Sequence, residues 1–212
     1  MRFSGVKKFF NDLRMQTRII LIRHGETRAN RQRRYVGVTE SELTSYGKYQ
    51  ARCLKKRIAK DTIDRIFVSP SRRALDFSKI VFGNRKKEIF ESLQEMNFGI
   101  FEGLTYSQAL KKYPQAYGRW LKNPQRFNIP KAEALIDFKA RVFSALKEVI
   151  SNNNGKTIAM VTHGGPIMLI VGKIMKSKNL WKVIPGLASI SIIEFNKSKP
   201  KILTLNDVSH YK

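Results

Sequence analysis

The stretch RIILIRHGET, residues 18–27, is an apolar run of strand length that ends abruptly in charged and polar residues. Two other short apolar runs, residues 64–68 (DRIFV) and 157–161 (TIAMV), end in the same way, in SPSRR and THGG. Short continuous apolar runs are typical of strands that are covered on both faces, as in a parallel sheet. The three runs therefore predict three strands of one buried sheet.

Helical patterns alternate with these strands. We expect a helix over residues 44–60, capped by Thr44, a second after Ser71, a third over residues 133–150, and another that opens at Pro166. Residues 189–195 and 201–205 have the composition of two further strands. In the first helix, the side chains expected to face inward are Tyr46, Gln50, Cys53, Leu54 and Ile58. The alternation predicts an α/β fold, a three-layer α/β/α sandwich around a mainly parallel sheet.

The composition limits the class of protein. A length of 212 residues fits one domain with, at most, a small lid. One cysteine excludes a disulfide framework and a cysteine-based zinc site, and three histidines beside 16 acidic residues leave little material for a metal cage. We therefore expect no metal and no cofactor. The chain has neither a long apolar run nor a secretory apolar region, which predicts a cytoplasmic protein without a transmembrane segment.

The charge of the chain is strongly basic. Forty-one Lys and Arg residues against 16 Asp and Glu give a formal net charge of +25, which is spread along the chain. In the densest part, residues 48–87, the charges surround an apolar helical face, and no aromatic-rich strand or zinc finger accompanies them. We expect a solvated exterior without a specific nucleic-acid partner, and a field that helps to attract phosphorylated substrates. A monomer and a homodimer are both compatible with the sequence.

Residues 1–15 form a separate segment. Phe3, Val6, Phe10 and Leu13 would share one helical face with basic residues around it, as in a weak membrane-surface or docking helix. The alternative is a disordered or non-native extension ahead of a start at Met15, because the first strand follows at once. We favour the extension and expect the main domain to span residues 16–212.

The residues that follow the three strands include His24, His163, Arg23, Arg72 and Arg73. In open α/β sheets the ligand crevice lies outside the carboxyl ends of the strands, so these imidazoles and guanidiniums should converge there. A lone histidine or arginine in such a place is more often structural, but the repetition at three strand ends favours a shared ligand. Arginine forks suit phosphate oxygens, and a helix that opens after the second histidine adds backbone N–H groups. The pattern predicts an anion pocket.

Phosphate chemistry without a metal requires a nucleophile, charge stabilisation and a proton donor. A neutral histidine with a free ring nitrogen can attack phosphorus, and neighbouring arginines keep it neutral. The arginines and the second imidazole can hold the equatorial oxygens as charge spreads. A carboxyl group beside the phosphate charge keeps its proton more tightly and can act as the general acid.

Ordered motifs resemble a known family. RHGET (residues 23–27) followed by Asn30 is similar to the signature of the histidine phosphatase superfamily, which includes the cofactor-dependent phosphoglycerate mutases. The other matching segments are LTSYGKYQA (43–51), SPSRRA (69–74), LQEMNFGIFEG (93–103) and THGG (162–165), which resemble the family's LTxxGxxQA, SPLxRA, LxExxFGxWEG and SHGG. The resemblance runs from Thr17 to about His210, and it implies a phosphoglycerate mutase-like fold with a small helical lid at about residues 97–132.

The resemblance also implies catalytic roles. His24 would be the residue that is transiently phosphorylated, and Arg23 and Arg73 would clamp the phosphoryl group. His163 would stabilise that group from the far side. Glu95 would protonate the leaving group and later activate water.

Further positions would bind the substrate. Asn30 and Gly164 would contact the phosphate together with the two arginines, whereas Arg72 is the less favoured clamp because the family's arginine directly precedes the alanine. Ser71 stands in place of the family's usual leucine, and residues 132–134 (AEA) stand where many members have Gly-Glu-Ser. The last departure affects a substrate-side loop, so it bears on the substrate more than on the chemistry.

Residues 113–142 resemble the lid region of α-ribazole phosphatases, which remove the 5′-phosphate during assembly of the nucleotide loop of cobalamin. The segment 205–210 is similar to the end of that subfamily. The resemblance thus implies a metal-independent phosphomonoesterase of a small phosphorylated metabolite, with α-ribazole 5′-phosphate as a candidate substrate in cobalamin biosynthesis.

Two alternatives share these motifs. A cofactor-dependent phosphoglycerate mutase would use the same chemistry but usually has a longer insertion after the acid motif. A non-catalytic binder of phosphorylated ligands or nucleic acid would not need every catalytic position. In either case the lid aromatics Phe98, Phe101, Trp120 and Phe127 would cap a small core or stack on a base or sugar.

Overall fold

The computed structural model describes residues 16–124, 126–177, 179–196 and 199–212, so the expected extension at residues 1–15 lies outside the described residues. The described residues form one six-stranded sheet in the order β3-β2-β4-β1-β5-β6. The strands are β1 (Thr17–Arg23), β2 (Arg65–Val68), β3 (Glu88–Ile89), β4 (Thr157–Thr162), β5 (Ile190–Phe195) and β6 (Lys201–Asp207). The first four are parallel, whereas β5 is antiparallel to β1 and β6 is antiparallel to β5. The mainly parallel sheet is therefore confirmed.

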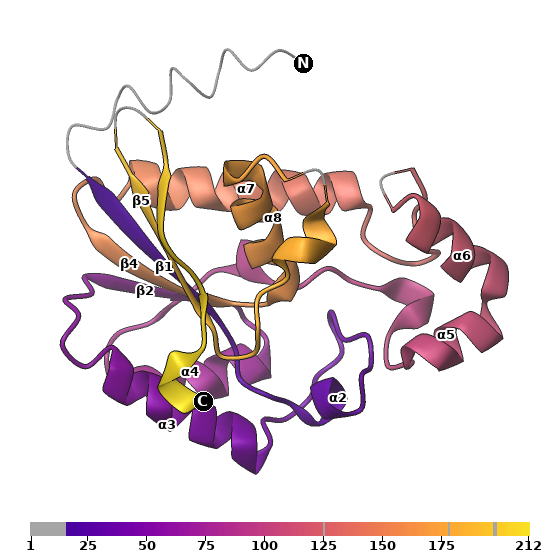
Figure 1. Cartoon of the computed structure of the whole chain (residues 1–212), viewed down its shortest axis with the longest axis horizontal. Coiled ribbons are helices and arrows are strands. Elements are labelled where there is room, and N and C mark those ends of the chain that lie inside the picture. Colours follow the sequence, from indigo (N-terminus) through magenta and orange to yellow (C-terminus); the bar gives the residue numbers. More distant parts are fainter. Residues whose placement is uncertain (1–15, 125, 178, 197–198) are drawn as a thin grey trace.

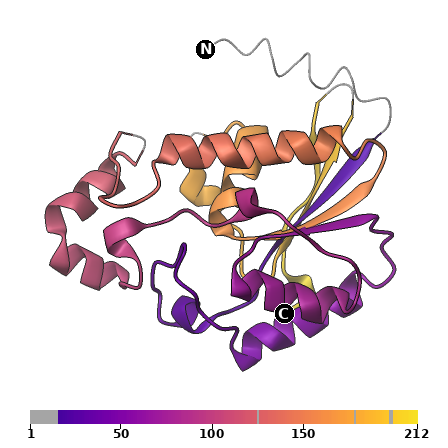
Figure 2. The same ribbon diagram turned by 180° about the vertical axis from the view of Figure 1, so that it is seen from behind.

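Helices cover both faces of this sheet: α3 and α4 lie on one side, and α7 and α8 lie on the other (Figures 1 and 2). The helices are α2 (Arg28–Arg31), α3 (Ser45–Arg57), α4 (Arg72–Phe82), α5 (Tyr106–Lys112), α6 (Pro114–Lys122), α7 (Leu135–Ser151) and α8 (Gly164–Ile174), with short 3-10 turns η1 (Glu91–Leu93), η2 (Gly99–Phe101), η3 (Leu180–Val183) and η4 (Ser209–Tyr211). This arrangement is the expected α/β/α sandwich.

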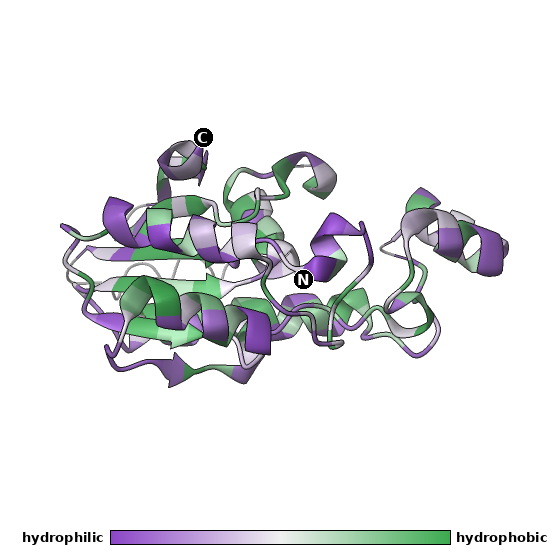
Figure 3. Ribbon diagram, turned by 90° about the horizontal axis from the view of Figure 1, so that it is seen from below, coloured by the Kyte–Doolittle hydropathy of each residue, from purple (hydrophilic) through white to green (hydrophobic). Residues whose placement is uncertain are grey.

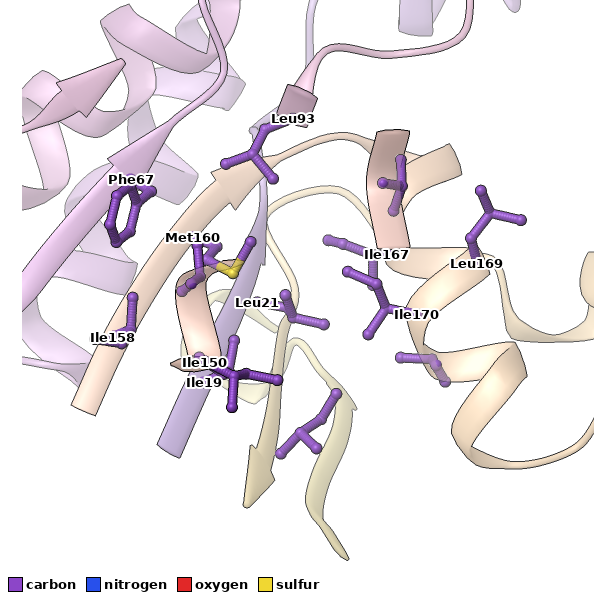
Figure 4. Packing of buried hydrophobic residues seen from close by; sticks show 14 of the residues in the cluster. Ile19, Leu21, Phe67, Leu93, Ile150, Ile158, Met160, Ile167, Leu169 and Ile170 are labelled. Atoms are coloured by element: carbon purple, nitrogen blue, oxygen red, sulfur yellow. The ribbon is translucent and has the colours of Figure 1, made fainter. Parts of the chain in front are cut away.

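Alternate residues of β1 supply the two halves of the core. Ile19 and Leu21 belong to the cluster that includes residues of α7 and α8, and Figure 4 shows Leu21 between Met160 of β4 and Ile167 of α8. Ile20 and Ile22 point the other way, into the cluster with α3 and α4. In Figure 3 the strands are largely hydrophobic and the outer helix surfaces are hydrophilic. The continuous apolar runs of the sequence are thus explained by a sheet that is buried on both faces.

Two details of the expected helices are wrong. The hydroxyl of Thr44 accepts from Gly47 N and caps α3 as expected, but Tyr46 is 43% exposed and Cys53 is only partly buried. The buried stripe is formed by Gly47, Gln50, Ala51, Leu54 and Ile58, which leaves the side chains of Tyr46 and Cys53 at its edge.

Helix α8 begins at Gly164, two residues before the expected start at Pro166. Pro166 therefore occupies the third position of the helix, where the missing N–H of proline costs no helical hydrogen bond.

The segment expected as a lid, residues 97–132, contains η2, α5 and α6, which project to one side of the sandwich (Figure 1). This aromatic lobe has its own core of Phe101, Ala109, Tyr117, Trp120 and Ile129. Phe101 is fully buried and Trp120 is 5% exposed, so these two rings cap a small core, the first of the two roles considered for them. Whether the lobe behaves as a lid stays a prediction.

In the part of the chain that the structure describes, no helix combines the length and the apolar character that a membrane span requires.

Candidate active site

The carboxyl ends of β1 and β4 place two histidines side by side. The register pairs Arg23 with Thr162, and the next residue of each strand is a histidine. The rings of His24 and His163 have centroids 5.1 Å apart and planes inclined by 66°. The convergence expected from the ends of parallel strands is therefore present.

His24 is a neutral imidazole with a defined tautomer. Its side chain is buried, and Nδ1 lies 2.8 Å from the carbonyl oxygen of Gly25. A carbonyl only accepts, so Nδ1 carries the proton and Nε2 carries the free lone pair. Burial lowers the pKa of His24 well below 6.5, and the charges of Arg73 and Arg23 lower it further. His24 therefore presents an unprotonated ring nitrogen at neutral pH.

His163 has the opposite tautomer. Arg73 donates from Nε to Nδ1 of His163 at 3.3 Å, and because a guanidinium only donates, Nδ1 of His163 must accept. The proton of the neutral ring is then on Nε2, which lies 2.7 Å from the hydroxyl of Ser69 and 3.3 Å from that of Ser71. Burial, followed by the charge of Arg73, lowers the pKa of His163 well below 6.5.

Two arginines, the partly buried Arg23 and the buried Arg73, bring positive charge to these histidines. Arg23 donates from Nη1 to the carbonyl of Pro185 at 2.6 Å, while its buried Nε has no hydrogen-bond partner within the described part of the chain. Arg73 is 1% exposed, and its two Nη atoms donate to the carbonyls of Thr39 (3.0 Å) and Gly37 (2.7 Å). Burial lowers the pKa of both arginines. A buried donor without an acceptor, among excess positive charge, is suited to an anion.

The carboxylate of Glu95 lies at the start of α8. Its Oε2 accepts from Gly165 N at 2.9 Å, and its Oε1 accepts from Met96 N at 3.0 Å. A Cβ atom on Gly165 would lie 2.1 Å from Oε1 of Glu95, so only glycine lets the carboxylate reach this helix terminus. The charge of Glu95 also acts on Arg23 and Arg73, which places it in the same cluster.

Arg141 of α7 holds the backbone of the loop that carries Glu95. Its guanidinium donates to the carbonyls of Ser92 (3.0 Å), Gln94 (2.7 Å) and Glu95 (3.1 Å). On its other side it forms a two-pronged ion pair with Glu133, with N···O distances of 2.6 and 2.8 Å. Glu133 and Arg141 were expected only as part of the segment that resembles the lid region of α-ribazole phosphatases, without a role in the site.

The remaining expected residues differ in placement. The amide oxygen of Asn30 accepts from the backbone N–H (3.1 Å) and hydroxyl (2.9 Å) of Thr27 in the capping box of α2, so that oxygen has a structural partner. Gly164 begins α8 beside Arg23, whose Cζ would lie 3.3 Å from a Cβ at this position. The side chain of Arg72 is 65% exposed and pairs with Asp76 at 3.6 Å, so Arg73 is the arginine of this pair that enters the site.

The arrangement combines a nucleophilic nitrogen, two guanidiniums, a second neutral imidazole and one carboxyl group. These are the groups that a phosphoryl transfer requires for attack, charge stabilisation and protonation of a leaving oxygen. Within the described ranges, no three side chains of His, Cys, Asp or Glu gather as a metal-binding group.

Comparisons with known proteins agree with this chemistry. Residues 19–208 match the model of the histidine phosphatase superfamily, branch 1. A metal-independent phosphoserine phosphatase from Arabidopsis thaliana is 29% identical, over 96% of this chain and 88% of that protein.

Solved structures of phosphatases are also similar to this chain. The α-ribazole phosphatase from Shigella flexneri is 25% identical, with a TM-score of 0.84, over 90% of this chain and 96% of that one. A histidine-to-alanine mutant of phosphoserine phosphatase from Entamoeba histolytica, in complex with phosphoserine, is 26% identical, with a TM-score of 0.82, over 92% of this chain and 98% of that one. The chain therefore belongs to branch 1 of the histidine phosphatase superfamily and is a phosphatase.

Proposed function

We propose that this protein hydrolyses the phosphate monoester of a small metabolite in two steps, through a phosphohistidine at His24. The contact between Nδ1 of His24 and the carbonyl oxygen of Gly25, at 2.8 Å, is the observation that supports the proposal most strongly. Since the Nδ1 proton is held by the carbonyl of Gly25, the lone pair of the neutral ring is on Nε2, and burial with two arginines keeps it there. A neutral, oriented imidazole is what attack on phosphorus requires.

In the first step, Nε2 of His24 attacks phosphorus and the bond from phosphorus to the ester oxygen breaks. Arg23 and Arg73 hold the nonbridging oxygens, with the unpartnered Nε of Arg23 as one donor. His163 stabilises the group from the other side. Glu95, in its protonated form, gives its proton to the departing alkoxide, so that a neutral alcohol leaves.

In the second step, the ionised carboxylate of Glu95 removes a proton from water as the water oxygen attacks phosphorus. The P–N bond breaks, inorganic phosphate leaves and His24 becomes neutral again. Glu95 ends protonated, ready for the next substrate. The backbone N–H groups of Gly165 and Met96 orient the carboxyl group of Glu95 between these steps.

For the substrate, we infer a small phosphomonoester, with two candidates. The sequence resemblance of the lid segment favours α-ribazole 5′-phosphate, in line with the name of the Shigella flexneri structure. Phosphoserine is the second candidate, since the Arabidopsis thaliana relative is named for it and the Entamoeba histolytica structure contains it. A phosphoglycerate mutase is the weaker alternative, because a mutase must retain the phosphoryl group for transfer rather than give it to water. We further propose a cytoplasmic location and no specific nucleic-acid partner.

The test is a phosphatase screen that includes α-ribazole 5′-phosphate, phosphoserine and p-nitrophenyl phosphate, each with and without EDTA. We expect release of inorganic phosphate that survives EDTA and is inhibited by vanadate. A parallel coupled assay, primed with 2,3-bisphosphoglycerate, measures transfer between 2- and 3-phosphoglycerate. EDTA-sensitive hydrolysis would contradict the metal-free mechanism, and transfer faster than hydrolysis would favour the mutase.

A further inference from the structure

Glu102 lies in the segment FGIFEG, residues 98–103, and it accepts hydrogen bonds from the N–H groups of a loop that is far away in sequence. Its Oε1 accepts from Gly37 N (2.9 Å) and Val38 N (3.3 Å), and its Oε2 accepts from Thr39 N (3.2 Å) and the hydroxyl of Thr39 (2.7 Å). The N–H of Phe98 is a further donor to Oε1, at 2.9 Å. One carboxylate thus organises residues 36–39, which we name the 36–39 loop.

The carbonyl groups of the same loop bind Arg73. Nη1 of Arg73 donates to the carbonyl of Thr39 at 3.0 Å, and Nη2 donates to that of Gly37 at 2.7 Å and, more weakly, to that of Val36 at 3.5 Å. The loop therefore lies between a carboxylate and a guanidinium, with N–H groups toward the first and carbonyl groups toward the second. In this arrangement each set of hydrogen bonds polarises the peptide groups in the sense that strengthens the other.

The close packing at Gly37 is an independent observation. A Cβ atom at this position would lie 1.8 Å from the carbonyl oxygen of Met96 and 2.6 Å from Oε1 of Glu102. Any side chain at Gly37 would push the loop away from Glu102 and displace the carbonyl that holds Arg73.

The hydrogen bonds that Arg73 makes within the protein determine how many of its N–H groups remain for a substrate. A guanidinium has about five N–H donors. One is directed to His163, and the carbonyls of Thr39, Gly37 and Val36 receive three more. One hydrogen of Nη1 therefore has no acceptor among these contacts and remains for a phosphoryl oxygen. The carbonyl groups that accept the other Nη hydrogens fix the orientation of the guanidinium.

We propose that Glu102 is a positioning residue for Arg73: through the 36–39 loop it fixes the direction in which the guanidinium meets the phosphoryl group. This inference rests on the proposed function, in which Arg73 binds that group. Glu102 itself does not contact the reacting atoms, so its loss should weaken phosphate binding and transition-state stabilisation without affecting protonation of the leaving group.

The experiment compares the wild type with Glu102→Gln, Glu40→Gln, Arg73→Ala and the double variant Glu102→Gln/Arg73→Ala. Glu40 is the matched control: its charge also acts on Arg73, but its carboxylate accepts from the backbone N–H of Arg72 (3.2 and 3.3 Å) rather than from the 36–39 loop. The measurements are the inhibition constant of inorganic phosphate, kcat/KM for an aryl and an alkyl phosphate, and thermal unfolding.

We expect Glu102→Gln to raise the inhibition constant of phosphate by about tenfold or more, with equal fractional losses of kcat/KM for both esters, because one lost charge-assisted contact of the clamp amounts to about a factor of ten. Glu40→Gln should change the inhibition constant less than about twofold. When Arg73 is already alanine, adding Glu102→Gln should have almost no further effect on phosphate binding.

Two results would overturn the inference while the proposed function stands: a folded Glu102→Gln protein with unchanged phosphate inhibition beside a weakened Arg73→Ala protein, or equal effects of Glu40→Gln and Glu102→Gln. If Arg73→Ala itself leaves phosphate inhibition unchanged, the clamp in the proposed function is wrong and the inference falls with it. Should Glu102→Gln not fold, Thr39→Val decides. It removes the hydroxyl that donates to Glu102, and an unchanged inhibition constant in this variant would contradict the inference.

Discussion

Arg73 donates from Nε to Nδ1 of His163, across 3.3 Å, and this contact fixes the tautomer of one histidine in the pair. His24 is fixed in the opposite sense by its own hydrogen bond to the carbonyl of Gly25. The two imidazoles, 5.1 Å apart, are therefore both neutral but carry their protons on different ring nitrogens. In the proposed mechanism, this asymmetry distinguishes His24, the nucleophile, from His163, the stabilising group.

The tautomers can be measured directly. We expect His24 to carry its proton on Nδ1 and His163 on Nε2, and both rings to stay neutral at pH 6.5, because burial lowers both pKa values well below that value. Long-range ¹H–¹⁵N correlation spectra across a pH titration report the ring nitrogens one by one. A ring that titrates with a midpoint near 6.5, or the same tautomer in both rings, would contradict the assignment.

The same shifts predict how stability depends on pH. Below about pH 6.5 the unfolded chain binds protons at His24 and His163 that the folded protein does not, so the free energy of unfolding should fall as the pH decreases from 7 toward 5. Each histidine contributes a slope of at most about 1.4 kcal/mol per pH unit. Urea denaturation at several pH values measures it. The variant His24→Asn should have a shallower slope than the wild type, and parallel curves for the two proteins would count against the buried neutral state.

Glu95→Gln isolates the general acid. The amide keeps the size of the side chain but has no proton to give, so turnover of alkyl phosphates should fall by roughly 10²- to 10⁴-fold. Phosphorylation by aryl phosphates should fall much less, because their leaving groups need little protonation. Pre-steady-state kinetics with both esters make the comparison. The control is Glu91→Gln, which changes an exposed carboxylate at the start of η1, four residues before Glu95. Equal slowing of phosphoenzyme formation from both esters would mean that Glu95 has another role.

Arg141→Ala should produce a milder form of the same pattern. Without the guanidinium, the carbonyls of Ser92, Gln94 and Glu95 lose their common donor, so the loop can no longer hold Glu95 in place. We expect alkyl phosphates to lose more kcat/KM than aryl phosphates, and the free energy of unfolding to fall by roughly 1–3 kcal/mol. Lys139→Ala, which removes a basic side chain from the same helix, is the control. A loss of stability with identical losses for both esters would make Arg141 purely structural.

The part of the account that could be predicted from sequence follows from strand topology. Parallel neighbours end at one edge, so His24 and His163, which follow the ends of β1 and β4, had to approach one another once the strands were recognised. Arg73 comes five residues after the end of β2, in the first turn of α4, at the same edge of the sheet. The choice of Arg73 over Arg72 came from the family resemblance. The geometry agrees, since Arg73 is buried and the side chain of Arg72 is 65% exposed.

Other features could not be predicted, because they depend on contacts between distant segments. Glu102 and Arg141 act mainly through backbone N–H and carbonyl groups of loops, and every residue type offers such groups, so the sequence does not point to these contacts. Tyr46 was expected to be buried, yet it lies at the edge of the apolar stripe of α3. There its ring stacks on the ring of Tyr49, with 5.9 Å between the ring centroids. A helical pattern gives the phase of such a stripe only to within about one residue.

The most direct test of the central claim is to trap the phosphoryl group. The protein is mixed with p-nitrophenyl phosphate, quenched in alkali within milliseconds, and its phosphopeptides are mapped by mass spectrometry. We predict one phosphoryl group on His24, none in His24→Ala, and no turnover by that variant, while His210→Asn is labelled like the wild type. Turnover by folded His24→Ala, or a phosphoryl group on any other residue, would contradict the account.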